Sequence, residues 1–210
     1  MNKTTLMAIL VIIFVTVIVV VKESREDLSN NILDKDAVIL AFGDSLTHGF
    51  GASTKDSYPA QLEKKTGFKV INAGVNGETT SEGLLRLPKF LQLKPDLVIL
   101  CHGGNDIMQK LSSKQLKSNL LSMIALIQKS GSKVLLVGVP DFSLFGFDTH
   151  EVYAEVVDES GVFFEDDVLT HIELHRGLKS DYVHPNYKGY EMMADAFIKV
   201  LQSYKVLARL

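Results

Sequence analysis

Three side chains along this sequence are of the types that perform nucleophilic acyl transfer. Ser45 carries a hydroxyl that becomes an effective nucleophile once a neighbouring base accepts its proton. His184 suits that role because an imidazole exchanges a proton near neutral pH. Asp181 lies three residues before His184, close enough along the chain for its carboxylate to hold the other ring nitrogen in the required tautomer. The pattern predicts a nucleophile, a base and an orienting acid.

Acyl transfer also requires hydrogen-bond donors aimed at the oxyanion that develops on the substrate. Losing one such donor costs about 2.7–4 kcal/mol of transition-state stabilisation. The expected donors are the backbone N–H groups of Ser45 and Gly74 and the side-chain amide of Asn105. Gly74 is favoured because it has no Cβ to obstruct a substrate.

The segments that hold these donors each follow a short apolar run that reads as a buried strand. Four such runs are present, at residues 37–42, 69–73, 96–101 and 133–139. Amphipathic stretches separate them, and this alternation is typical of a parallel sheet covered by helices on both faces. The carboxyl ends of parallel strands border the ligand crevice of an open sheet, so the polar segments are expected to meet there.

The helical stretches follow the spacing of apolar residues. Helices are expected at residues 58–66, 81–93, 116–129 and 190–201, and Pro88 is expected to bend or break the second of them. Residues 141–180 lack a clean periodicity and are interpreted as a partly helical insertion before the last helix.

The N-terminal segment predicts a membrane anchor. Residues 6–21 contain no charge and one polar side chain, Thr16, and the run is just long enough to span a bilayer as an apolar helix. No Ala-x-Ala cleavage pattern follows it, which favours an uncleaved signal anchor at 1–22 over a cleaved signal peptide. A polar tether at 23–36 and a domain at 37–210 follow. The domain would face the periplasm or exterior, tethered to the membrane or, if the segment is cleaved, free.

Composition excludes several other classes of protein. The formal net charge of the 210-residue chain is −3, and no run of Lys or Arg suggests a nucleic-acid surface. The single cysteine, Cys101, excludes an intrachain disulfide and a cysteine-based zinc site. We expect no cofactor, no metal and no obligate protein partner.

Four segments carry a resemblance to a known family. Residues 42–47 (Phe-Gly-Asp-Ser-Leu-Thr), 72–77 (Asn-Ala-Gly-Val-Asn-Gly), 103–106 (Gly-Gly-Asn-Asp) and 181–185 (Asp-Tyr-Val-His-Pro) resemble, in order, the four sequence blocks of SGNH (GDSL) hydrolases. The resemblance implies a three-layer α/β/α, flavodoxin-like fold with a parallel sheet of about five strands. It also implies a triad of Ser45, Asp181 and His184 and an oxyanion hole of Ser45, Gly74 and Asn105.

The resemblance is greatest to the small bacterial arylesterase, thioesterase and lysophospholipase type. We therefore expect a serine esterase that hydrolyses carboxylic ester or thioester bonds through an acyl-enzyme on Ser45, acting on a small-molecule or lipid acyl ester. One alternative is a carbohydrate O-acetyl esterase or an acyltransferase on envelope glycans. A second is a non-catalytic, membrane-anchored binding protein. Phe142, Leu144 and Phe145 either form core or line an acyl-binding groove.

The remaining polar residues of these segments have simpler interpretations. Asp44 and Asp106 are expected to accept backbone N–H bonds and shape their turns. His48 and His102 lie near the site in sequence without an assigned role. His171 and His175 are four residues apart, a spacing that suits two ligands of one metal ion, but the sequence shows no third ligand.

Overall fold

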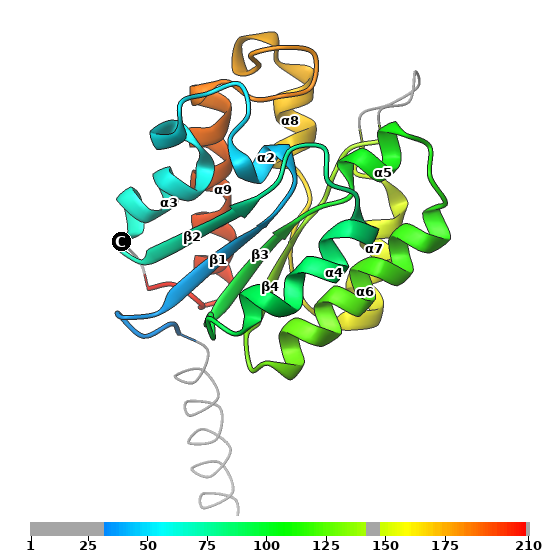
Figure 1. Ribbon diagram of the computed structural model, residues 1–210. Coiled ribbons are helices and arrows are strands. Elements are labelled where there is room, and N and C mark those ends of the chain that lie inside the picture. Colours follow the sequence, from blue (N-terminus) through cyan, green and yellow to red (C-terminus); the bar gives the residue numbers. More distant parts are fainter. Residues whose placement is uncertain (1–31, 142–147, 209–210) are drawn as a thin grey trace, which may run out of the picture.

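The computed structural model describes residues 32–141 and 148–208, and Figure 1 shows their arrangement. Five parallel strands form one sheet in the order β2-β1-β3-β4-β5. They are β1 (Val38–Gly43), β2 (Lys69–Gly74), β3 (Leu97–Cys101), β4 (Lys133–Val137) and β5 (Phe163–Glu165). Every residue of β3 is buried, because helices cover both faces of the sheet. The predicted α/β fold with a parallel sheet of about five strands is confirmed.

The helices form the two outer layers. On one face α3 packs on α9, and α9 contacts α8 and β5. On the other face α6 packs on both α4 and α7. The α-helices are α2 (Ser45–His48), α3 (Tyr58–Thr66), α4 (Thr80–Leu91), α5 (Gly104–Met108), α6 (Ser113–Lys129), α7 (Glu151–Ser160), α8 (Val168–Leu174) and α9 (Tyr187–Ser203); two 3₁₀ turns lie at Thr54–Asp56 and Arg176–Leu178.

Helix α4 runs through Pro88 without a break, so of the two predicted effects, a bend or a break, the break is wrong. The helix begins with a capping box, in which Thr79 and Glu82 satisfy each other's backbone N–H groups. Its interior is fixed by packing, since Leu87 is fully buried. Pro88 lies in the last turn of α4, so the hydrogen bond that its missing N–H removes, to the carbonyl of Leu84, is near the end of the helix.

The described residues 148–180 continue the alternation of strands and helices, so for them the interpretation as an insertion is wrong. They contain α7, β5 and α8, and β5 extends the sheet by pairing with β4. The strand has three residues at the sheet edge, too few for a periodic signal. Phe142, Leu144 and Phe145 lie outside the described residues, so their predicted place in an acyl groove stays a prediction.

The described chain begins at the amino-terminal end of the sheet, opposite the carboxyl ends of the strands (Figure 1). Leu33 is buried there, and its backbone N–H donates to the carbonyl of Val206 at 2.9 Å. The predicted tether at 23–36 thus extends into residues that pack against the domain. The predicted anchor at residues 6–21 lies outside the described part of the chain. Within that part, no helix combines the length and apolar character needed to cross a bilayer.

Glu165 ends β5 with a buried carboxylate, 5% exposed. Its oxygens accept the N–H groups of Val168, at 3.1 and 3.3 Å, and of Asp167, at 3.3 Å, at the start of α8. Burial raises the pKa of Glu165 from 4.5 to about 7, although these backbone hydrogen bonds lower it. The folded protein therefore holds a proton there that the unfolded chain releases at lower pH.

This shift predicts a pH-dependent gain of stability in Glu165→Gln. The buried carboxyl does not lower the free energy of unfolding of the wild type below the unfolded pKa of 4.5. Above the folded pKa of about 7 it lowers this free energy by its full amount, up to about 3 kcal/mol. Urea unfolding from pH 4 to pH 9 should show the variant gaining on the wild type between those values and the gain levelling above pH 7. Asp167→Asn is the matched control. A pH-independent difference would contradict the assignment.

Candidate active site

Ser45 lies at a sharp turn between β1 and α2. Gly43 ends the strand, and a Cβ there would overlap the carbonyl oxygen of Cys101 on neighbouring β3. The buried side chain of Asp44 accepts the N–H of Leu46 at 3.0 Å and caps the helix, which confirms its predicted role in shaping the turn. Ser45 is the first residue of α2, so its N–H has no carbonyl partner within the helix.

His184 lies in the loop before α9, 139 residues from Ser45, and the fold brings the two together. The Nε2 atom of His184 lies 3.0 Å from Ser45 Oγ, and Nδ1 lies 2.8 Å from Asp181 Oδ2. Because an ionised carboxylate can only accept, Nδ1 carries the hydrogen and Nε2 presents its lone pair to the hydroxyl. The three predicted side chains thus form a continuous hydrogen-bonded series.

Asp181 is held in place by its own loop. Its Oδ1 accepts the backbone N–H groups of Val183 and His184, both at 2.8 Å. Burial acts to raise the pKa of Asp181, but these two hydrogen bonds and the one from the His184 ring outweigh it and lower the pKa to about 2. The carboxylate is therefore ionised throughout the pH range in which an esterase works.

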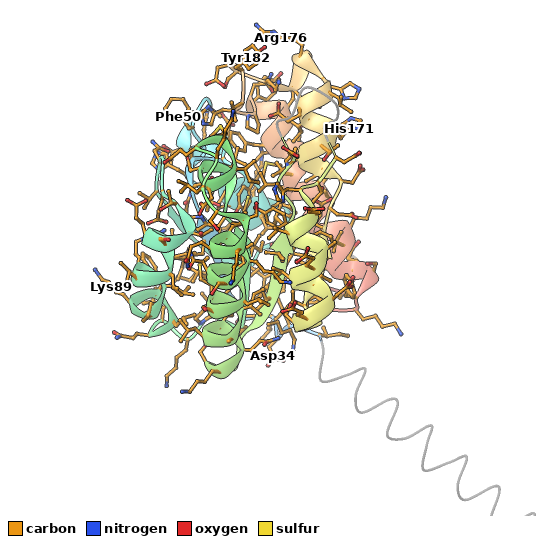
Figure 2. The ribbon with its side chains drawn as sticks, turned by 90° about the vertical axis from the view of Figure 1, so that its right-hand side faces the viewer. Asp34, Phe50, Lys89, His171, Arg176 and Tyr182 are labelled. Carbon is orange, nitrogen blue, oxygen red and sulfur yellow. The ribbon has the colours of Figure 1, made fainter. Side chains whose placement is uncertain are left out.

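Two further contacts fix the loop that carries the acid and the base. Lys179 Nζ donates to Glu173 on α8 at 2.9 Å and to the carbonyl of Tyr182 at 3.0 Å, so it ties the loop to that helix. The ring of Phe50 lies against the ring of His184 with 4.5 Å between centroids. Phe50 and Tyr182 are 45% and 85% exposed and lie toward the same end of the molecule, whereas Asp34 lies at the other end (Figure 2).

Asn105 lies in the first turn of α5, four residues after the end of β3, where it is 9% exposed. Its Nδ2 donates to the carbonyl of Glu78 at 3.0 Å and lies 3.4 Å from Asp44 Oδ2. The contact with Asp44 places the amide of Asn105 beside the residue that precedes Ser45. Asn105 therefore has the location that the predicted oxyanion donor requires.

Gly74 does not have the geometry of the second backbone donor. Its N–H already donates to Asn72 Oδ1 at 2.9 Å, and a Cβ at this position would overlap the backbone nitrogen of His48 on α2. The absence of a side chain at Gly74 therefore serves the packing of β2 against α2. The prediction of Gly74 as an oxyanion donor is replaced by a residue three positions on.

Gly77 is the better candidate for that donor. It has a positive φ of 77°, and a Cβ built on it would meet nothing within 4 Å, so the residue faces open space. It directly precedes Glu78, whose carbonyl holds Asn105. Among the described residues, the Gly77 N–H has no hydrogen-bond acceptor. The two glycines belong to one short sequence block, and only the backbone conformation distinguishes them.

The remaining polar residues singled out from the sequence lie outside the triad. Asp106 accepts the N–H of Thr80, at 2.8 Å, and its hydroxyl, and so holds the start of α4. His48 is exposed, and His171 stacks on His175 at 4.1 Å. Across residues 32–141 and 148–208, no group of three or more His, Cys, Asp or Glu side chains is arranged to hold a metal ion.

A narrow groove beside Ser45 is lined mainly by apolar side chains, and its volume is about 10 Å³. It lies between α2, the end of β4, α8 and the loop of His184, and its lining residues are Leu46, Val139, Pro140, Leu169, Ile172, Glu173, Val183 and Pro185. Leu46 follows the nucleophile, and Val183 and Pro185 flank the base. The groove therefore borders the segments that carry the nucleophile and the base.

A sequence profile of the GDSL-like lipase/acylhydrolase family matches residues 41–192, a stretch that includes all four segments. The chain belongs to this family. A relative named arylesterase from Vibrio mimicus is 32% identical over 171 residues, which are 75% of this chain and 84% of the relative. A relative from Escherichia coli K12, named thioesterase 1/protease 1/lysophospholipase L1, is 28% identical over 172 residues, 78% of this chain and 83% of the relative.

Solved structures agree with this assignment. The esterase AlinE4, described as a member of the SGNH-hydrolase family, is 30% identical with a TM-score of 0.64 and covers 82% of this chain and 98% of its own. A structure titled TesA is 28% identical with a TM-score of 0.73 over 79% of this chain. The GDSL-family protein described here is a carboxylic ester hydrolase, as its sequence blocks predicted.

The geometry of Asp181 predicts a simple acid limb for activity. Since the pKa of Asp181 is about 2, its carboxylate stays ionised between pH 8 and pH 4, and at most one group of the triad can then contribute an acid limb in that range. A plot of log kcat/KM against pH for p-nitrophenyl acetate should then fall with a slope of one.

Asp181→Asn should lower kcat by about 10⁴-fold, because the amide no longer selects the tautomer with a lone pair on Nε2. Asp195→Asn on α9 is the control and should retain full activity. An acid limb of slope two, or full activity in Asp181→Asn, would contradict the predicted role of the acid.

Proposed function

We propose that this protein is a serine esterase that cleaves carboxylic ester or thioester bonds through an acyl-enzyme on Ser45. The observation that supports it most directly is the 3.0 Å contact between Ser45 Oγ and His184 Nε2, with Asp181 on the far side of the ring. A hydroxyl next to the unprotonated nitrogen of an oriented imidazole is an activated nucleophile.

The reaction proceeds in two steps. Ser45 Oγ attacks the ester carbonyl carbon while His184 takes the hydroxyl proton, and His184 then gives that proton to the departing alcohol or thiol. In the second step His184 takes a proton from water, which attacks the acyl-enzyme and releases the acid. The ionised Asp181 stabilises the imidazolium formed in each step.

The oxyanion of each step is stabilised by the N–H groups of Ser45 and Gly77 and the amide of Asn105. The orphan N–H at the start of α2 and the open face of Gly77 support this assignment. Asn105 supports it through its buried amide, which its contact with Asp44 places beside the nucleophile segment. Such preorganised donors stabilise the developing charge without having to reorganise during the reaction.

The nucleophile is tested by Ser45→Ala, which should abolish hydrolysis of p-nitrophenyl acetate and labelling by a fluorophosphonate probe. Ser122→Ala, on the exposed face of α6, is the matched control and should keep both. A wild-type protein that neither labels nor turns over ester would favour the alternative of a non-catalytic binding protein. Full activity in Ser45→Ala would overturn the proposed mechanism.

The groove supports a preference for short acyl groups. Its volume of about 10 Å³ is close to the space that one water molecule needs. This narrowness is the observation that favours the second candidate function, a carbohydrate O-acetyl esterase or an acyltransferase on envelope glycans. The apolar lining favours the acyl chain of an aryl ester, thioester or lysophospholipid.

Chain-length preference distinguishes these substrates and can be shifted. Leu169→Ala removes part of the α8 wall of the groove, so the ratio of kcat/KM for p-nitrophenyl octanoate to that for the acetate should rise by about tenfold. Val168→Ala, buried on the same helix but not in the groove, is the control for the loss of packing. An unchanged ratio in a folded Leu169→Ala protein would show that acyl chains bind elsewhere.

The predicted domain organisation becomes part of the proposal. A signal anchor at 1–22 would tether the hydrolase domain to a membrane, with that domain in the periplasm or exterior. The uncharged run at 6–21 is the observation that supports it. The catalytic mechanism does not depend on this segment.

A further inference from the structure

A second polar cluster lies next to the site, and the reaction described above does not use it. Arg86 on α4 binds the carboxylate of Glu78 with two hydrogen bonds, from Nε to Oε1 at 2.7 Å and from Nη2 to Oε2 at 2.6 Å. The Glu78 side chain is 6% exposed and the Arg86 side chain 21%. A paired guanidinium and carboxylate in this setting are fixed in orientation as well as in position.

The guanidinium of Arg86 also contacts the ends of two strands. Its Nη2 donates to the carbonyl of Ala73, at 2.9 Å, and lies 3.5 Å from the carbonyl of Gly43. The group stacks on the ring of Phe42, 4.2 Å from its centroid. Arg86 thereby connects the turn that leads to Ser45 with the turn that leads to Gly77.

Glu78 carries the connection to the third strand end. Its Oε2 lies 3.1 Å from Nε2 of the fully buried His102, and Nδ1 of that ring accepts the N–H of Gly103. The hydrogen of the neutral ring is therefore on Nε2 and points at Glu78. The backbone carbonyl of Glu78 accepts Asn105 Nδ2. One residue thus contacts both the start and the functional amide of the segment after β3.

The charges in this cluster are retained when the protein is folded. Burial acts to raise the pKa of Glu78, but the hydrogen bonds from His102 and Arg86 outweigh it and hold the pKa below its ordinary value. A buried ion pair contributes little net stability compared with apolar side chains of similar size. The role of this ion pair is therefore to hold its partners in place, and these partners belong to all three segments of the oxyanion hole.

We propose that the Glu78–Arg86 ion pair, with His102, positions the oxyanion hole by fixing the Asn105 amide and the turn that contains Gly77. The inference rests on the proposed function of the Ser45 site. None of the three side chains needs to contact substrate. They act through the carbonyl of Glu78 and through the strand ends, so their loss should weaken stabilisation of the transition state more than binding of the ground state.

The test removes the charge pair without leaving a lone buried charge. The double variant Glu78→Gln, Arg86→Met should lower kcat for p-nitrophenyl acetate by about 10- to 100-fold, with KM changed by less than about twofold. Lys117→Met breaks the ion pairs of Lys117 with Glu155 and Glu159 between α6 and α7 and is the control for the loss of an ion pair far from the site. Circular dichroism and thermal melts confirm that each variant is folded.

A cycle with Asn105→Ala separates positioning from a general effect on the fold. Asn105→Ala alone should lower kcat by about 10²- to 10³-fold. In that background the further loss caused by the double variant should be clearly smaller than its loss in the wild type, because one of the two groups that it positions is gone. An equal loss with and without Asn105, or unchanged kcat in a folded double variant, overturns the inference. Failure of the Ser45 mechanism is recognised separately, by activity that survives in Ser45→Ala.

Discussion

The hydrogen bond between Ser45 and His184 is the contact on which the rest of the site depends, and the whole sheet is needed to form it. The serine follows β1, an interior strand of the sheet, and the histidine precedes α9, the last helix on one face. The two residues are 139 positions apart and meet because β1 ends and α9 begins at the same edge of the sheet (Figure 1). Any change that rotates α9 on the sheet would lengthen this contact before it disturbed either residue locally.

Two polar networks hold the two halves of the site independently. Lys179 and Glu173 tie the loop of the acid and the base to α8. Glu78 and Arg86 tie the ends of the first three strands on the side of the oxyanion donors. The nucleophile lies between them, at the start of a helix of four residues that is anchored by Asp44. A short helix of this kind has little stability of its own, and both networks therefore supply rigidity that α2 lacks.

Much of this architecture was predictable because the physical signal is local. Helix α3 has the predicted bounds, because Gly67 and the strand-like run that follows mark its end, and Asp181 precedes His184 by one turn of loop. Strand β5 was not predicted, because three residues are too few to show the alternation of a strand. The choice between Gly74 and Gly77 required the backbone torsions and the partner of each N–H. The cluster around Arg86 could not be foreseen, since Glu78 and Arg86 are charged residues eight positions apart and nothing in the sequence indicates that they are buried together.

The entry of the described chain at the amino-terminal end of the sheet determines how the enzyme can be attached to anything else. Leu33 packs beside Val206, so the described chain starts on the side opposite the catalytic residues. A resin, a fluorophore or a fused protein joined through the N-terminal segment would leave the mouth of the site facing free solution. Immobilisation through that end would therefore be compatible with full turnover of dissolved esters, whereas coupling through Tyr182, at the other end, would block access.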